Sequence, residues 1–256
     1  MNIRFLGTGT STGNPEIGCK CEVCTSSDTK DRRFRASLLL EIGEKHLLID
    51  CGPDFRMQML EMFKTNPFEV LNGVLLTHEH YDHVGGLDDL RAFCKYGVID
   101  IYAEDYVAEA IQSRIPYVFA ADKYPGVPNL QINTIQPDFP FFIDEIEIIP
   151  IRLMHGKLPI LGYRTGKTAY LTDLKTIPDN EYTKLQGLDV LIINALREKE
   201  HISHETLCDA LKNIERIRPK KAYLTHMSHG FGLHEKMQQQ LPKNVFIAYD
   251  GLEISV

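Results

Sequence analysis

Short apolar runs recur along this chain, separated by residues that favour turns. Runs of about four to eight residues fit buried strands better than helices. They predict strands at residues 2–7, 36–43, 45–50, 72–77, 98–103, 130–135, 145–154, 168–173, 189–196, 221–226 and 245–251. Between several of them the apolar positions follow a helical period, which predicts helices at residues 55–64, 103–113, 181–186, 204–216 and 233–240. Strands and helices therefore alternate, and the pattern indicates an α/β architecture built in layers.

The least regular part of the chain is residues 114–130, where three prolines and one glycine interrupt any period. This composition predicts a loop. Its aromatic residues Tyr117, Phe119 and Tyr124 have two interpretations: they cap a substrate pocket, or they pack the loop onto the body of the protein. No linker, repeat or low-complexity tract divides the 256 residues, so a single domain over 1–256 is predicted.

The composition, 43% hydrophobic and 25% charged residues, is ordinary for a globular protein. The 28 basic and 35 acidic residues leave a net charge of -7. An acidic surface does not favour a phosphate backbone, so nucleic acid is not the expected partner. The first residues contain no apolar stretch of signal-peptide length, and no window approaches the ~20 apolar residues of a membrane helix. A cytoplasmic protein without a membrane partner is therefore predicted.

The densest group of titratable side chains is the segment LLTHEHYDHVGG, residues 75–86. Imidazole nitrogens and carboxylate oxygens both bind zinc-like divalent ions. In an extended segment alternate residues point the same way, so the first two histidines share one side, whereas Glu79 and Tyr81 are expected to face away. Two ligands for one ion and two for its neighbour is the natural division, because one ion cannot reach all four without strain. The candidate ligands are His78, His80, Asp82 and His83. A merely solvated polar turn, the alternative, would leave them without a common partner.

Three cysteines lie close together in a polar loop at residues 18–26: Cys19, Cys21 and Cys24. Six cysteines in a reducing compartment do not suggest a disulfide framework, so their spacing is interpreted first as a metal site. Three thiolates around a tetrahedral zinc ion need a fourth ligand from elsewhere in the chain. Three buried or merely reduced thiols are the alternative. Cys51, Cys94 and Cys208 are expected to be small core residues.

The His-x-His-x-Asp-His spacing resembles the signature of the metallo-β-lactamase superfamily. The resemblance extends over nearly the whole chain and implies the family's fold, a four-layer αββα sandwich with the metals at one edge between the two sheets. It also implies a supporting Asp after an earlier strand, matched by Asp50, and further ligands at strand ends, matched by His155, Asp173 and His226. One ion would be held by His78, His80 and His155, the other by Asp82, His83 and His226, with Asp173 bridging them.

Within the superfamily the cysteine trio resembles the PhnP-type phosphodiesterases and, more loosely, the PqqB proteins of cofactor biosynthesis. The PhnP type implies His229, three positions after His226, as the fourth ligand of a structural zinc. Such a closed site leaves no position for water. The resemblance also implies that His204 is a non-ligand catalytic histidine that binds a phosphoryl oxygen or protonates the leaving group. Alternatively, residues 203–206 only begin a helix, with Ser203 as its cap.

These features predict a metal-dependent phosphodiesterase acting on a small cyclic or diester phosphate, and the resemblance makes phosphoribosyl 1,2-cyclic phosphate the specific expectation. Two neighbouring divalent ions would supply hydroxide near neutral pH and neutralise phosphoryl oxygens. Zinc or manganese suits these ligands, with iron as a further alternative. His204 and Asp82 are the expected catalytic residues. The oligomeric state stays open, with a homodimer among the alternatives.

A PqqB-like accessory or binding protein is the alternative from another class, and tRNase Z-like and thioesterase activities are alternatives within the fold. The tRNase Z type shares the histidine at position 204 but normally has a long arm for tRNA, for which residues 114–130 are too short. Glyoxalase II-type thioesterases lack the cysteine loop. His46, His201 and His234 carry no comparable signal and are expected at the surface or in packing roles.

Overall fold

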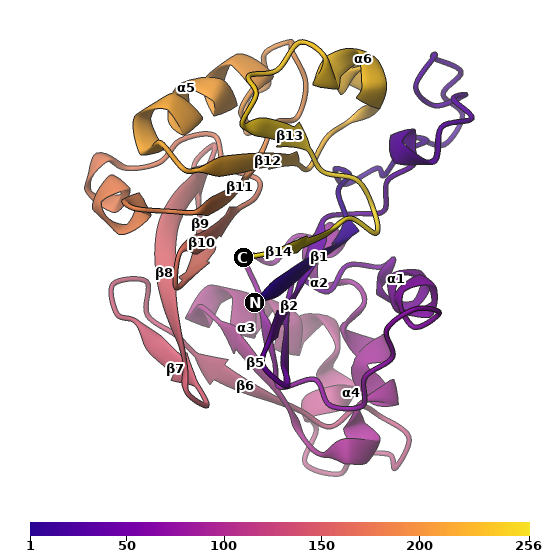
Figure 1. Cartoon of the computed structure of the whole chain (residues 1–256). Coiled ribbons are helices and arrows are strands. Elements are labelled where there is room, and N and C mark those ends of the chain that lie inside the picture. Colours follow the sequence, from indigo (N-terminus) through magenta and orange to yellow (C-terminus); the bar gives the residue numbers. More distant parts are fainter.

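Two seven-stranded mixed β-sheets face each other in this protein, whose computed structural model describes residues 1–256 (Figure 1). The first sheet contains, in spatial order, β14 (Glu253–Ser255), β1 (Asn2–Gly7), β2 (Ser37–Ile42), β3 (Lys45–Ile49), β4 (Gly73–Leu75), β5 (Ile99–Ala103) and β6 (Leu130–Thr134). The second contains β13 (Val245–Ile247), β12 (Lys221–Thr225), β11 (Val190–Asn194), β10 (Thr168–Leu171), β9 (Leu158–Thr165), β8 (Ile146–His155) and β7 (Phe141–Ile143).

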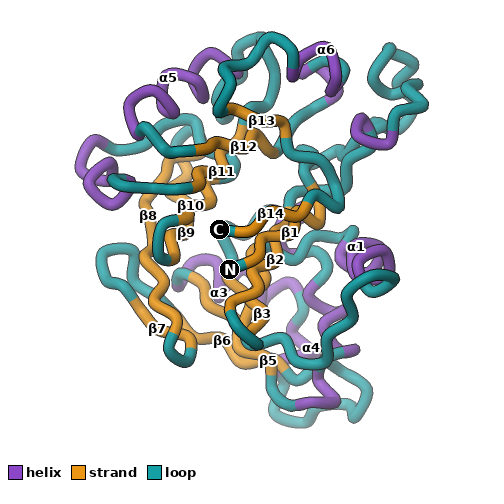
Figure 2. Tube along the Cα trace, viewed as in Figure 1, coloured by secondary structure: helices purple, strands orange, loops and turns teal.

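Helices cover the outer face of each sheet, so the chain forms four layers (Figure 2). The α-helices are α1 (Phe55–Met62), α2 (Tyr81–Val84), α3 (Asp105–Arg114), α4 (Pro116–Phe119), α5 (Leu207–Ile217) and α6 (His234–Gln238). The 3-10 helices are Thr29–Asp31, Leu87–Ala92, Cys94–Tyr96, Asp179–Leu185 and His229–Phe231. This arrangement confirms the predicted αββα sandwich. None of the helices has both the length and the apolar character needed to cross a membrane.

The alternation of side chains along the strands divides the apolar residues among three cores. Leu38 on β2 packs between the sheets, while its neighbour Leu39 packs under the helices of the first half. On β11, Ile192 packs between the sheets and Ile193 packs against α5. Successive residues of a strand point to opposite faces, so a nearly continuous apolar run supplies two cores at once. The apolar runs in the sequence therefore mark strands that are buried on both sides.

Every predicted run contains a strand, but β7, β9 and β14 were not predicted. The strand β9 was missed because Pro159 and Gly162 interrupt its apolar pattern. A side chain in place of Gly162 would stand 2.6 Å from Leu171 Cδ2 and 2.8 Å from the carbonyl oxygen of Tyr170 on β10. The glycine thus permits the close approach of two strands and does not mark a loop.

Several predicted helix boundaries were wrong. The helix expected at residues 204–216 begins at Leu207, because the Thr206 side chain accepts a hydrogen bond from Asp209 N and the Asp209 side chain accepts one from Thr206 N. This capping box makes Thr206, and not Ser203, the N-cap. The helix expected at residues 181–186 is a 3-10 helix at Asp179–Leu185, and the predicted loop at residues 114–130 includes α4.

The N-terminal segment is tied to the C-terminal half of the chain through Arg33. This buried guanidinium donates hydrogen bonds to Thr8 Oγ1 at 2.7 Å and to the carbonyl oxygen of Ala248 at 2.6 Å. Its Nη2 lies 3.4 Å from His234 Nδ1. The backbone N–H of His234 donates to Asp31 Oδ1 at 2.8 Å. These contacts join segments about 200 residues apart and hold the N-terminal segment on the side of the molecule that carries α6 (Figure 1).

Candidate metal centre

Three of the predicted site residues stand within two positions of a strand end and have a left-handed backbone. Asp50, after β3, has φ 63°, and the corresponding angles are 59° at Asp173 after β10 and 57° at His226 after β12. A side chain in this region is uncommon and is kept only where the surrounding structure fixes it. Here it turns a polar side chain sharply away from an apolar strand, toward the space between the two sheets.

Four acidic and imidazole side chains converge at one buried point. The ligand atoms of Asp82, His83, Asp173 and His226 all lie within 4.8 Å of one another. Asp173 Oδ1 is 3.3 Å from His83 Nε2 and 3.1 Å from His226 Nε2. Yet neither of these buried nitrogens makes a hydrogen bond, as expected of metal ligands that share one ion. Two ligand atoms on one zinc stand roughly 3.3 Å apart, given metal–nitrogen distances of about 2.0–2.1 Å, so the set fits a divalent ion.

The other three predicted ligands lie beside this group. His78 Nε2 and His80 Nδ1 are 3.0 Å apart, which also suits two ligands of one ion. His78 Nε2 lies 3.8 Å from Asp173 Oδ2, so the two oxygens of Asp173 face the two sets. The ring of His155 is 5.2 Å from that of His80, and the carbonyl oxygen of Asp173 fixes its Nδ1 at 2.6 Å. The structure thus brings all seven residues together, and their assignment to two ions stays a prediction.

The carboxylate of Asp50 supports the site from behind. It is fully buried and accepts hydrogen bonds from Thr77 N at 2.9 Å and from Thr77 Oγ1 at 2.9 Å. Its Oδ2 lies 2.7 Å from His83 Nδ1, and Thr77 Oγ1 lies 3.0 Å from His78 Nδ1. Burial raises the pKa of Asp50, against the opposing charge of His83. Through these contacts one carboxylate orients two imidazoles, one from each proposed ion site.

The charges of the site are arranged to hold cations. Burial opposes protonation of His226, but Asp173 and Asp82 outweigh it and raise the pKa of His226 to about 9. The pKa of His83 is raised for the same reason, despite burial. Burial alone would raise the pKa values of Asp82 and Asp173, yet the neighbouring imidazoles hold both well below the usual range. The carboxylates are thus ionised and need positive charge beside them, which protons or divalent ions can supply.

His204 lies against this centre. Its ring is 4.5 Å from that of His155 and 5.1 Å from that of His226, and its side chain is buried. Burial lowers its pKa to about 3, against the opposing effect of Asp173. The residue precedes α5 by three positions, so it belongs to a loop and does not open the helix. The ligand atoms of His155, Asp173 and His204 lie within 4.8 Å of one another, so the place of His204 as a non-ligand histidine and its chemical role both stay predictions.

His201 was expected at the surface or in a packing role. Its side chain is partly exposed, and its ring centroid lies 4.9 Å from that of His204, so it stands beside a predicted site residue. His46 stacks on Phe68 at 4.1 Å, and His234 is buried, so these two have the expected packing roles.

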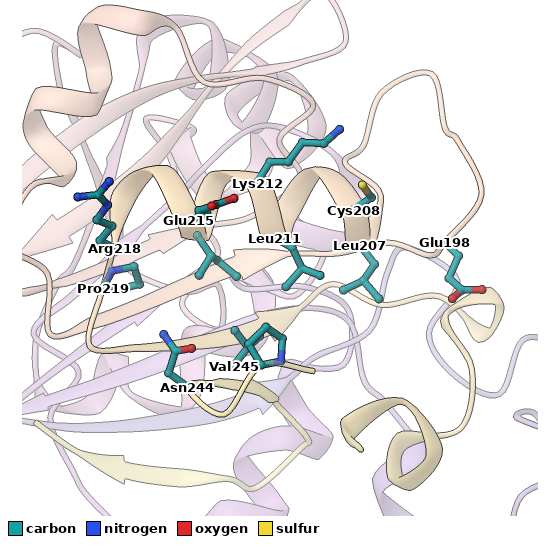
Figure 3. A pocket seen from close by; sticks show the side chains of 12 residues that line it. Glu198, Leu207, Cys208, Leu211, Lys212, Glu215, Arg218, Pro219, Asn244 and Val245 are labelled. Atoms are coloured by element: carbon teal, nitrogen blue, oxygen red, sulfur yellow. The ribbon is translucent and has the colours of Figure 1, made fainter. Parts of the chain in front are cut away.

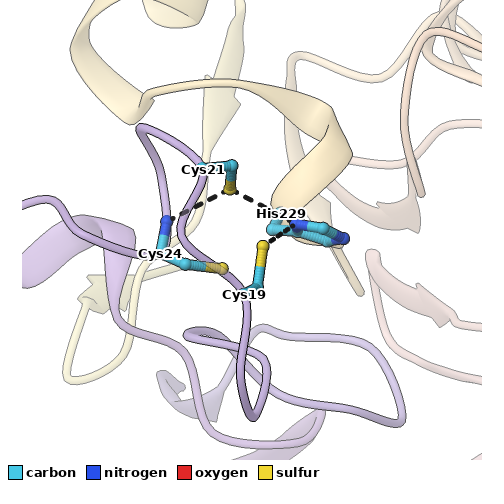
Figure 4. A group of neighbouring side chains, drawn as sticks. All are labelled: Cys19, Cys21, Cys24 and His229. Carbon is cyan, nitrogen blue, oxygen red and sulfur yellow. Dashed lines mark hydrogen bonds between the residues drawn. The ribbon is translucent and has the colours of Figure 1, made fainter.

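The three cysteines of the N-terminal loop meet His229, as Figure 4 shows. His229 Nδ1 lies 3.3 Å from Cys19 Sγ and 3.3 Å from Cys21 Sγ. The backbone N–H of Cys24 and the side chain of His229 lower the pKa of Cys21 to about 6, while burial raises that of Cys24 to about 11. Zinc–sulfur distances of about 2.3 Å fit this set of four donors. The predicted structural zinc thus has its four ligands in one place.

The remaining cysteines and the aromatic residues of the loop at 114–130 differ in burial. Cys51 is fully buried, and Cys94 packs against the core between the first sheet and its helices. Cys208 is exposed on α5, so its prediction as a core residue was wrong. Phe119 packs against the same core, whereas Tyr117 and Tyr124 are exposed. In the signature segment Tyr81 is exposed as expected, and Glu79 is half-buried.

A large groove lies away from this centre, on the outer face of the second half. It has a volume of about 770 Å³ and runs between α5 and residues 242–245 (Figure 3). Leu207 and Leu211 point into it. Its lining includes none of the predicted ligands, so its size does not make it the reaction site.

Comparisons with known proteins identify the family. A profile of the beta-lactamase superfamily domain matches residues 45–227. The crystal structure of a new diphosphatase from the PhnP family is 35% identical, covers 100% of this chain and 97% of its own, and has a TM-score of 0.91. Zn²⁺-bound PqqB from Methylobacterium extorquens has a TM-score of 0.79 at 19% identity, covering 100% of both chains, which shows the shared fold. This chain belongs to the metallo-β-lactamase superfamily, and its fold and relatives support a hydrolase that binds divalent metal.

A further relative carries a different name. An octanoyltransferase of Porphyromonas gingivalis is 46% identical over 256 residues, which are 99% of this chain but 51% of the relative. The chain thus spans about half the length of that protein. The name describes a protein of which half lies outside the match, so it does not by itself assign octanoyl transfer to the matched half.

Proposed function

We propose that this chain is a metal-dependent hydrolase of phosphodiester or diphosphate bonds in a small substrate. The observation that carries the proposal is the meeting of seven predicted ligands and His204 in one buried site. The 35% identity to a diphosphatase over the full chain supports it. Phosphoribosyl 1,2-cyclic phosphate is the specific phosphodiester expected from the sequence.

The residues have distinct parts in this proposal. His78, His80 and His155 would hold one divalent ion, and Asp82, His83 and His226 the other, with Asp173 between them. When bound, such ions lower the pKa of a water molecule to near neutrality and neutralise charge on the phosphoryl group. His204 lies against members of both sets, so it is placed to contact a phosphoryl oxygen or the leaving oxygen. Asp50 keeps His83 oriented.

The charge of the protein favours a small anionic substrate over nucleic acid. A net charge of -7 repels a long phosphate backbone, whereas a single phosphate group responds mainly to the groups around the site. Residues 114–130 form a short connection with one helical turn and no extended arm. We therefore place the chain with enzymes of small phosphorylated molecules.

The purified protein, loaded with zinc or with manganese, should be assayed against several substrate classes. These are bis(p-nitrophenyl) phosphate, 2',3'-cyclic nucleotides, phosphoribosyl 1,2-cyclic phosphate, a diphosphate diester and an octanoyl thioester. We expect cleavage of at least one phosphorus–oxygen bond, abolished by His83→Ala. Cleavage of the thioester alone would overturn the proposal and favour a thioesterase of the same fold.

Metal analysis separates this enzyme from an accessory protein of PqqB type. Three ions per chain are expected, because the buried centre offers two ligand sets and the cysteine loop offers a third. A single ion, removed by substitution of the cysteines, would favour the accessory role. Gel filtration of the same sample would decide between a monomer and the homodimer.

A further inference from the structure

One residue of the N-terminal segment, Glu16, contacts three of the four predicted ligands of the structural zinc. Its backbone N–H donates to Cys24 Sγ at 3.4 Å, and its carbonyl oxygen accepts from Cys19 N at 3.1 Å. Its side chain reaches the C-terminal part of the chain, where Oε2 lies 3.0 Å from His229 Nε2. Glu16 is not itself one of the four residues that meet there. It is therefore placed to organise the site without binding the ion.

The two ring nitrogens of His229 have different neighbours. Nδ1 lies 3.3 Å from both Cys19 Sγ and Cys21 Sγ, whereas Nε2 faces Glu16. Figure 4 shows one nitrogen directed at the sulfur atoms and the other directed away from them. A neutral imidazole has one N–H and one lone pair, and the hydrogen bond at one nitrogen decides which nitrogen can bind a metal. An ionised carboxylate only accepts hydrogen bonds, so the proton belongs on Nε2 and the lone pair on Nδ1.

Both residues of this pair are anchored by hydrogen bonds that do not involve the cysteines. Just before the glutamate, Asn14 and Arg33 exchange two backbone hydrogen bonds, at 2.9 and 2.8 Å. Next to the histidine, Ser228 donates from its N and from its Oγ to the carbonyl oxygen of Leu196, each at 3.0 Å. The backbone on each side of the contact is thus held without the ion. The carboxylate can therefore orient the ring before zinc binds.

We propose that Glu16 is a positioning residue of the cysteine site and fixes His229 to bind zinc through Nδ1. This inference rests on the predicted structural zinc and is independent of the reaction at the buried centre. Metal-binding histidines commonly donate the N–H of their second ring nitrogen to a carboxylate, which orients the ring and raises its basicity. With 33% of the His229 side chain and 40% of the Glu16 side chain exposed, the pair itself contributes little to the stability of the fold. Its effect should therefore appear in the affinity for zinc.

The test measures metal affinity at the cysteine site alone. Cobalt(II) bound there gives a thiolate-to-cobalt charge-transfer absorption, which the buried centre does not give because its predicted ligands include no thiolate. Loss of this absorption in competition with a chelator should be compared in the wild type, Glu16→Ala and Glu16→Gln. We expect Glu16→Ala to lower the affinity about tenfold, the lower end of the usual effect, because the pair is partly exposed. Glu16→Gln should retain part of the affinity, since its amide oxygen still accepts the N–H.

Glu22→Ala is the matched control, because Glu22 belongs to the same loop but pairs with Lys236 and with none of the four ligands. It should leave the affinity unchanged. In the zinc-bound wild type, ¹⁵N NMR should show the proton of the His229 ring on Nε2. A ring that carries its proton on Nδ1, or an affinity that is the same in Glu16→Ala and the wild type, would overturn the proposal. A wild type without the thiolate-to-cobalt absorption would refute both the proposal and the zinc site on which it rests.

Discussion

His83 and Asp50 form a fully buried pair, with His83 Nδ1 2.7 Å from Asp50 Oδ2. The carboxylate receives the N–H on one side of the imidazole, so the opposite nitrogen, Nε2, faces Asp82 and Asp173. Such a carboxylate fixes the tautomer of a metal-binding histidine and raises its basicity. The pair therefore sets the orientation and basicity of His83 Nε2, the nitrogen that would bind the ion.

Asp50→Asn should weaken metal binding while the protein stays folded. The amide keeps the shape of the carboxylate but loses its charge and one acceptor oxygen, so we expect the affinity for zinc to fall about 10–100-fold. Competition with a chelator of known affinity measures this. Asp54→Asn is a suitable control, because Asp54 bonds to Arg35 and contacts none of the predicted ligands. Equal affinity in Asp50→Asn and wild type would show that the pair has no such role.

Cys21→Ser should remove one zinc equivalent and destabilise the protein. The four donors join residues 19–24 to His229, and binding energy at such a site is folding energy. We expect a fall in melting temperature of about 5–10 °C. Elemental analysis and thermal unfolding provide the two readouts. Cys208→Ser, at an exposed position on α5, should change neither, and zinc content that stays the same in Cys21→Ser would contradict the assignment.

The strands that carry the metal centre were predictable from apolar runs, but only residues 75–86 indicated metal by themselves, and the other site residues were identified through the resemblance to a known family. Asp50, Asp173 and His226 each follow a strand that is buried on both faces, and such strands are easily recognised in a sequence. The polar residue that ends each run therefore marked the edge of the sheet. The resemblance to a known family then ordered these residues into ligand sets.

The remainder depended on packing that a single sequence does not express. Cys208 was expected in the core because it lies in a helical context. The buried face of α5 contains Ala210, Ile214 and Ile217, and Cys208 lies on the opposite, exposed face. The place of His201 depends on backbone hydrogen bonds that close a loop, and these leave no pattern in the sequence.

His204→Ala should lower kcat by about 10² or more while metal content stays the same. The ring lies against His155 and His226, so its loss removes a contact to the reacting group without removing a predicted ligand. Steady-state kinetics with elemental analysis of the same sample separate the two effects. His46→Ala is the control, because His46 stacks on Phe68 and contacts no predicted site residue. A variant with unchanged kcat would remove His204 from the mechanism.

The contact between Arg33 and His234 should make the protein less stable in mild acid. Burial, with the charges of Arg33 and Lys30, lowers the pKa of His234 to about 4, whereas the unfolded chain has a value of about 6.5. Between these values the unfolded state binds more protons, so the free energy of unfolding falls as pH falls from about 6.5 to about 4. Above this window the contribution is fully present.

His234→Asn tests this because the amide oxygen can still accept from Arg33 but does not titrate. Urea unfolding near neutral pH and near pH ~4.5 measures the loss of stability in each protein. We expect the wild type to lose about 1–2 kcal/mol more than the variant over this interval, a value reduced from the full linkage because the ring is only partly desolvated. Other histidines titrate in both proteins and cancel in the difference. Parallel losses in the two proteins would show that His234 is not held neutral by Arg33.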